Sequence, residues 1–172
     1  MGVVFSRLLQ SVKLERDAFV WMDFNDRATG DAAMLVIGTQ FLMALGLGTP
    51  VFSLIHPATL INVFIGALFG WIVYSGAVYV VSHYLLEGSG NFAIYLRTSG
   101  FAYPTLLLVI VTWRIIPDVY LALLAAGVWF VVIVANGLSY VVDLSIQKAF
   151  AAAVGGLIVM VIAQSILGSL RF

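Results

Sequence analysis

The sequence predicts an all-α integral membrane protein, a bundle of five transmembrane helices with an amphipathic N-terminal interfacial helix. Of its 172 residues, 63% are hydrophobic and only 9% are charged, and the mean hydropathy is +1.11. A soluble domain carries roughly 45–50% apolar and about 25% charged residues. These few charges cannot cover the surface of a soluble fold, so we place the chain in a bilayer.

Long runs without charged residues predict the number of spans. Fifty-five residues lacking Asp, Glu, Lys and Arg separate Asp31 from Glu87. A helix needs about 20 residues to cross the hydrocarbon, so this run holds two spans, with a turn at Pro50 and Pro57. Three further runs follow. The predicted spans are 32–52, 58–84, 98–113, 119–142 and 149–170.

These spans divide the chain into a cytosolic or interfacial N-terminal segment, 1–31, and a transmembrane domain, 32–172. The N-terminal segment has apolar residues at helical spacing with basic residues around them, which is typical of a helix lying in the membrane interface. Those apolar residues are Phe5, Leu8, Leu9 and Val12. The segment lacks the layout of a signal peptide, so we expect the first span to stay uncleaved.

The distribution of Lys and Arg predicts the orientation. With the N-terminus inside, six of these residues fall on the inner side and two, Arg114 and Arg171, on the outer side. Because cytoplasmic loops are enriched in Lys and Arg, we expect the N-terminus in the cytoplasm and the C-terminus outside.

Polar side chains inside the spans are the first candidates for a functional site, because each is costly in lipid unless it faces protein or water. Asn136, Ser139, Tyr140 and Asp143 lie at i, i+3, i+4 and i+7 on one face of the fourth span, and Gln147 continues that face. Two interpretations stay open: a polar site or helix contact, or the hydrated end of the helix.

Arg97 and Arg114 bound the short third span, and we expect both to reach the headgroups. Arg114 can pair with Asp118 or bind a lipid phosphate. Arg97 can pair with Asp143, because both belong to the inner side. The five residues from Phe92 to Leu96 are predicted to be a short lead-in outside the membrane.

Small residues predict helix packing, because they let helices approach closely in lipid. Gly66 and Gly70 form a GxxxG pair in the second span, and Ala152 and Gly156 form a similar pair in the fifth. The partner helices can belong to the same chain or to another.

The composition argues against several function classes. There is no cysteine, and no net charge that would indicate a nucleic-acid partner. No catalytic, cofactor-binding or metal-binding motif is present, and His56 and His83 lack a neighbouring ligand at helical spacing. We therefore expect no enzyme activity, no cofactor and no metal.

Several motifs along nearly the whole chain agree with one family. They are Phe5-Ser6-Arg7-Leu8-Leu9, Asp17-Ala18-Phe19, Asp26-Arg27-Ala28-Thr29-Gly30, Gly88-Ser89-Gly90, Leu96-Arg97-Thr98-Ser99-Gly100-Phe101-Ala102-Tyr103-Pro104, Trp129 and Gln147-Lys148-Ala149. In these motifs the chain resembles the short prokaryotic members of the Yip1-domain family.

The resemblance implies a five-helix fold in a prokaryotic cell membrane and a role in membrane organisation. Eukaryotic relatives act in vesicle trafficking and bind prenylated small GTPases through a longer N-terminal region. This chain has about thirty residues there and no similar acidic, proline-containing stretch, which argues against GTPase binding.

The sequence is therefore interpreted as a non-enzymatic, membrane-organising or trafficking-type scaffold that acts through helix–helix contacts. Its expected partners are membrane lipids and either further copies of itself or another integral membrane protein. Two alternatives stay open. One is an accessory subunit of a larger, energy-transducing membrane complex. The other is a small oligomeric transporter or channel, which the buried amides favour; these are Gln40, Asn62, Asn136 and Gln164.

Overall fold

A computed structural model describes residues 2–116 and 118–169, without the side chains of residues 119–120 and 164–169. Every element in these ranges is a helix, and five are long and apolar enough to cross a membrane. The fold class and the number of spans predicted from the sequence are confirmed. The five are Ala28–Gly46, Pro57–Leu85, Phe92–Ile115, Leu121–Val141 and Ile146–Ala163.

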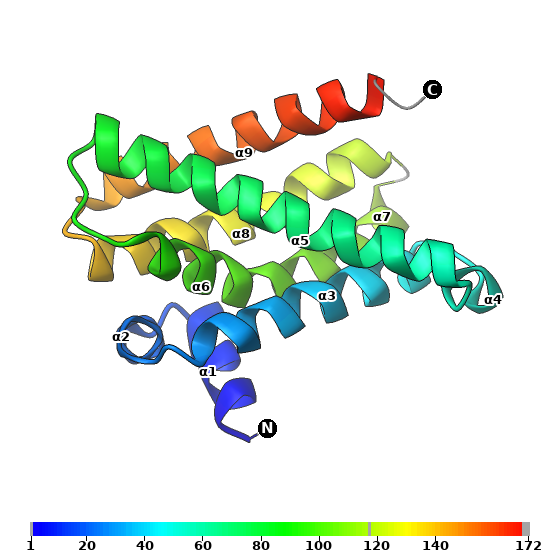
Figure 1. Cartoon of the computed structure of the whole chain (residues 1–172), viewed down its shortest axis with the longest axis horizontal. Helices are drawn as coiled ribbons and strands as arrows, with labels where there is room; N and C mark the ends of the chain where they lie inside the picture. The colour runs from blue at the N-terminus through cyan, green and yellow to red at the C-terminus, as the bar shows by residue number, and fades with distance from the viewer. Residues whose placement is uncertain (1, 117, 170–172) are drawn as a thin grey trace.

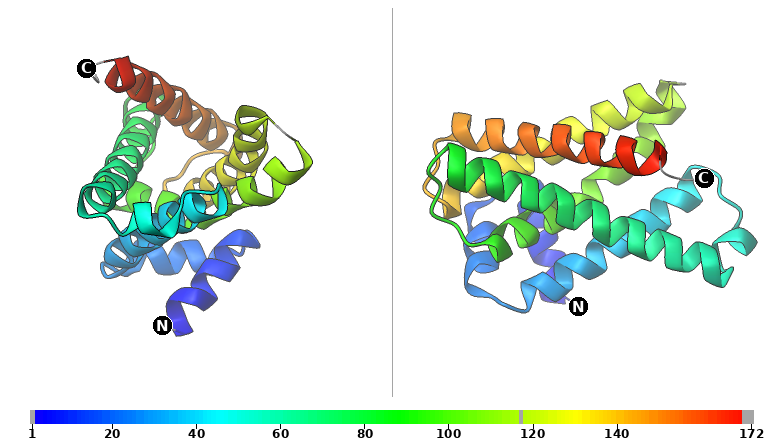
Figure 2. Two further views of the ribbon diagram at one scale, coloured as in Figure 1. Left: turned by 90° about the vertical axis from the view of Figure 1, so that its right-hand side faces the viewer. Right: turned by 45° about the horizontal axis from the view of Figure 1, so that its top comes forward.

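Successive long helices run in opposite directions along the bundle, so that alternate connections meet at the same end (Figure 1). We call the end that holds the 86–91 and 142–145 loops the N-terminal end, because α1 and α2 lie beside it. Figure 2 shows these two helices together on one side of the bundle.

The elements are α1 (Gly2–Val12), α2 (Arg16–Phe24), α3 (Ala28–Gly46), α4 (Val51–Leu54), α5 (Pro57–Val80), the π-helix η1 (Val81–Leu85), α6 (Phe92–Ala102), the 3-10 helix η2 (Tyr103–Leu107), α7 (Leu108–Ile115), α8 (Val119–Val141) and α9 (Ile146–Ser169).

The third span is the centre of the bundle. It is 56% buried, against 22% for the first and fifth spans, and α6 contacts α1, α2, α3, α5 and α8. Small residues make this position possible. A Cβ atom at Gly100, for example, would lie 3.1 Å from the Cα atom of Ala32 in α3. Any side chain at Gly100 would therefore push the first and third spans apart.

The first span differs from its predicted bounds at both ends. It begins at Ala28, four residues earlier than predicted, because the Asp31 carboxylate is compatible with the first turn of a helix, where the dipole favours negative charge. It ends at Gly46 because Gly48 adopts a φ of +94°. The N–H groups of Gly48 and Thr49 then bond the carbonyls of Leu45 and Ala44, which closes the helix.

The third span also begins earlier than predicted. Phe92–Leu96 was expected to lie outside the membrane, but it is the first part of α6, capped by the Asn91 side chain, which accepts from Ile94 N–H at 3.1 Å. The prediction was wrong because it took Arg97 as the boundary of the apolar segment. Arg97 is instead buried inside the protein, where its charge does not end the helix.

The predicted apolar face of the N-terminal helix is divided between two environments. Leu8 and Val12 pack against the protein core, whereas Phe5 and Leu9 are exposed. Part of the predicted apolar face is therefore buried against protein, because α1 packs against α2 and α6, and the placement of this helix in the membrane interface stays a prediction.

Candidate functional site

Arg97 joins the N-terminal helices to the bundle. Its side chain is 6% exposed, and three nitrogen atoms donate hydrogen bonds. Nε donates to Thr29 Oγ1 at 2.8 Å, and Nη1 donates to the carbonyl oxygens of Met22 and Asp23 at 3.0 Å each. Nη2 contacts Asp26 Oδ1 at 2.7 Å. We call these five residues the Arg97 cluster; every acceptor in it lies between residues 22 and 29.

The chemistry of this cluster is that of a helix cap supplied by another helix. The carbonyl groups of the last turn of α2 have no partner within their own helix, and a cation there interacts favourably with the helix dipole. The Asp26 side chain is fully exposed, so water screens its ion pair with Arg97. The carbonyl and hydroxyl acceptors therefore account for most of the stabilisation of the buried guanidinium group.

Helix α2 is also held by close packing. Phe19 and Met22 are fully buried, and the Phe19 ring lies over Gly137 of α8, where a Cβ atom would come within 2.6 Å of the ring. Trp21 packs edge-on against Phe101 of α6, with ring centroids 6.0 Å apart. Because α2 contacts both α6 and α8, it is a fixed part of the folded domain.

Helix α1 is tied to α2 by Arg7. Its guanidinium carbon lies 5.6 Å from the centre of the Trp21 ring, which is a cation–π arrangement. Arg7 also donates to Gln10 Oε1 at 2.9 Å and to the carbonyl oxygen of Asp17 at 3.4 Å. Arg7 thus connects α1 to α2, and Arg97 connects α2 to the central span.

The predicted contacts of Arg97 were wrong. It does not reach the headgroups, and its partner is Asp26 rather than Asp143. Asp143 instead accepts a hydrogen bond from Ser89 Oγ at 2.8 Å. It therefore connects the 86–91 loop to the residues that follow α8.

A model of the Yip1 domain matches residues 18–167, nearly the whole chain. The chain belongs to the Yip1-domain family. Comparisons with curated proteins and with solved structures found no match. The matched region of this Yip1 domain begins inside α2, so it includes the Arg97 cluster together with all five spans.

The polar residues on the fourth span of the Yip1 domain have different surroundings. Ser139 Oγ donates to the backbone oxygen of Asn136 at 2.7 Å, and the Tyr140 ring lies 6.1 Å from Phe19. Asn136 Oδ1 is buried without a hydrogen-bond partner in the structure. Asp143 lies beyond the helix end. The four side chains therefore do not form one joint site in the described structure, and Gln147 is exposed.

The small residues of the two predicted pairs also differ. Ala152 and Gly156 are buried, and a Cβ atom at Gly156 would clash with Val78 Cγ2 of α5. Gly70 is buried too, but Gly66 is exposed and has nothing within 4 Å of its Cβ position. The fifth-span pair thus serves packing within the chain, and Gly66 is open.

Arg114 is exposed in the last turn of α7, so its role as a headgroup or Asp118 contact stays a prediction. His56 is exposed before α5, and His83 stacks on Tyr79 at 5.2 Å. Across residues 2–116 and 118–169, no group of three His, Asp or Glu side chains is placed to hold a metal ion.

One cluster that the sequence did not reveal joins α5 to α6. Trp71 Nε1 donates to the carbonyl oxygen of Leu96 and to Ser99 Oγ, both at 3.0 Å. Ser75 Oγ lies 2.7 Å from Ser99 Oγ. Nearer the N-terminal end, Ser82 of η1 and Tyr95 of α6 share a 2.6 Å hydrogen bond. The serines were visible as polar positions, but their partners lie on another helix.

Proposed function

We propose that this Yip1 domain is a non-enzymatic scaffold that organises membrane proteins through helix–helix contacts, with a second copy of the chain as its first partner. The observation that carries the proposal is the open face of α5. Gly66 has nothing within 4 Å of its Cβ position, and Asn62, one turn earlier on the same face, is exposed.

This face combines the two features that drive helix association in lipid. A glycine lets two backbones approach, and an amide gains a hydrogen-bond partner that lipid cannot offer. The comparable pair on α9 is already filled by Val78 of α5. Among the four small residues predicted to pack, all of which the structure describes, Gly66 is therefore the one that leaves room for a second chain.

The orientation proposed with this function keeps the N-terminus in the cytoplasm of a prokaryotic cell. Lys148 and the basic residues of α1 and α2 lie at the N-terminal end of the bundle, whereas Arg114 lies at the other end. Arg171, the second outer residue of the prediction, lies outside the described residues. Even without the buried Arg97, the basic residues are more numerous on the proposed cytoplasmic side.

The experiment is gentle extraction from native membranes, followed by native mass spectrometry and an absorption spectrum of the same sample. We expect a homo-oligomer that the Gly66→Leu variant converts to monomer. Gly127→Leu on α8, where the Cβ position also has nothing within 4 Å, should leave the oligomer intact. A monomer without any protein partner would overturn the proposal. A stoichiometric foreign complex or a bound chromophore would replace it with the accessory-subunit function, and solute flux in liposomes would replace it with the transporter function.

A further inference from the structure

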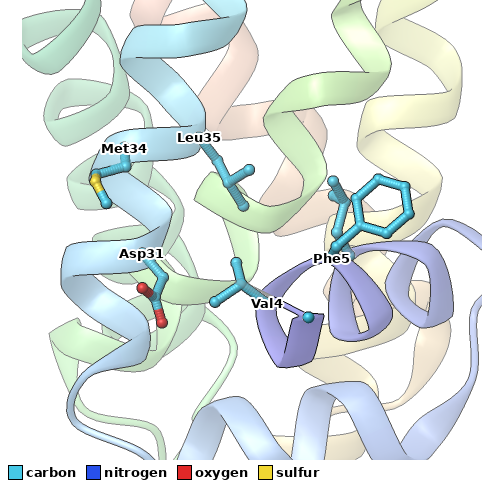
Figure 3. Close-up of a pocket in the computed structure, with 7 residues that line it drawn as sticks. Val4, Phe5, Asp31, Met34 and Leu35 are labelled. Atoms are coloured by element: carbon cyan, nitrogen blue, oxygen red, sulfur yellow. The ribbon is translucent and has the colours of Figure 1, made fainter.

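A groove separates α1 from the beginning of α3. It has a volume of about 600 Å³ and is lined by two sets of residues, Gly2, Val4, Phe5 and Leu8 from α1 and Asp31, Met34 and Leu35 from α3. Figure 3 shows the carboxylate of Asp31, which comes from α3, facing the side of the groove where Val4 of α1 lies.

Asp31 is the charged residue in this lining. It is half-buried, and none of the side chains that the structure describes forms a hydrogen bond or ion pair with its carboxylate. Arg7 is engaged with Gln10 and Trp21, and Arg97 with its own cluster. Arg27, one turn before Asp31, is exposed, and no hydrogen bond or ion pair joins its side chain to Asp31 in the described part of the chain. A half-buried carboxylate without a partner favours a ligand that brings a positive charge.

We place the groove at the depth where lipid headgroups meet the hydrocarbon. Asp31 is in the first turn of a membrane span, and the apolar lining residues Met34 and Leu35 follow it towards the membrane interior. Exposed Phe5 on α1 forms part of the opposite wall. A ligand that fits these surroundings has a cationic end at Asp31 and an apolar chain along the groove.

We propose that this groove binds one membrane phospholipid with a primary ammonium headgroup, of the phosphatidylethanolamine class. The ammonium group donates hydrogen bonds to the Asp31 carboxylate, and one acyl chain lies on the apolar walls. A quaternary ammonium group has no N–H to donate, and an anionic headgroup is repelled by the carboxylate. The volume lies within the range of about 300–1,000 Å³ that is usual for small-molecule sites. The site goes beyond the proposed scaffold function and does not depend on self-association.

A simpler role for Asp31 is interaction with the dipole at the start of its helix. Asp17 provides a matched control, because it also lies in the first turn of a helix, α2, but is exposed and absent from the groove lining. A dipole interaction alone does not distinguish between lipid headgroups, whereas the proposed hydrogen bond does.

The test is native mass spectrometry of the full chain in micelles that contain equal amounts of phosphatidylethanolamine, phosphatidylcholine and phosphatidylglycerol with identical acyl chains. We expect one phosphatidylethanolamine to be retained, with a preference of about tenfold or more, as for a hydrogen bond to a charged group. Asp31→Asn should remove the preference, whereas Asp31→Glu and Asp17→Asn should keep it.

Equal retention of the three lipids by the unaltered protein, or preferential retention of phosphatidylglycerol, would overturn the proposal without the use of any variant. An unchanged preference in Asp31→Asn would overturn the assigned residue and with it the site. Circular dichroism of each variant checks that its helices are intact. The oligomeric state is recorded in the same spectra, so failure of the scaffold function is seen separately.

Discussion

Replacement of Arg97 by lysine keeps the positive charge but removes the planar fork that holds the end of α2. The guanidinium group bonds four acceptors through three nitrogen atoms. The single ammonium nitrogen of a lysine can keep the hydrogen bonds to the carbonyls of Met22 and Asp23. It then loses the hydrogen bond to Thr29 Oγ1 and the contact with the exposed Asp26. One lost bond from a charged donor to Thr29 costs about 1.5–3 kcal/mol, and the screened Asp26 contact adds little.

This loss should appear as local opening of the N-terminal helices. An increase of about 1.5–3 kcal/mol in the free energy of the docked state corresponds to roughly 10- to 150-fold faster exchange of protected amides. Hydrogen-exchange mass spectrometry in lipid nanodiscs measures this effect for each segment. We expect faster exchange in α2 and residues 25–29, with α9 unchanged, because α9 packs mainly against α5 and α8.

Arg114→Lys is the control, since Arg114 is exposed on α7 and the same chemical change there should leave α2 exchange unaltered. If Arg97→Lys leaves α2 as protected as in the unaltered protein, Arg97 does not hold the helix. If protection falls equally in α9, the residue supports the whole bundle, and its specific connection to α2 is refuted.

Two further predictions concern glycines at close helix contacts. Gly137→Leu should displace the Phe19 ring from α8 and raise hydrogen exchange in α2, whereas Gly127→Leu, at an open position on the same helix, should not; equal exchange in the two variants would contradict this. Gly156→Ala should lower the thermal unfolding midpoint in detergent, because its Cβ atom meets Val78 and overpacking costs about 1–3 kcal/mol. Gly127→Ala should change stability by at most about 1 kcal/mol, and a midpoint for Gly156→Ala at or above that of Gly127→Ala would show that the contact relaxes freely.

The sequence was sufficient for the fold class and the number of spans, because lipid excludes charge and the resulting apolar runs are visible without any tertiary information. Arg97 shows where this reasoning ends. A charged residue marks the edge of a span only if the protein offers it no partner. Its acceptors include two backbone carbonyls from 74 and 75 residues earlier in the chain, and a carbonyl acceptor has no signature in the pattern of side chains.

The small-residue pairs show a second limit. Gly66 with Gly70 and Ala152 with Gly156 have the same spacing, and nothing local distinguishes them. The structure fills the position beside Gly156 with Val78 and leaves Gly66 open. Which pair packs within the chain depends on how the spans are arranged, and the spacing of small residues does not predict that arrangement.

The position of the Arg97 acceptors has a consequence for biosynthesis. Residues 22–29 leave the ribosome before Arg97 does, so the acceptors are already made when the third span reaches the membrane. An arginine at the centre of a membrane helix costs about 2.5–3.5 kcal/mol during insertion, and less towards the helix end. Arg97 lies in the first half of the third span, and acceptors made in advance offset its cost. We therefore expect the N-terminal helices to assist insertion of the third span, so that a chain synthesised without them inserts that span less efficiently.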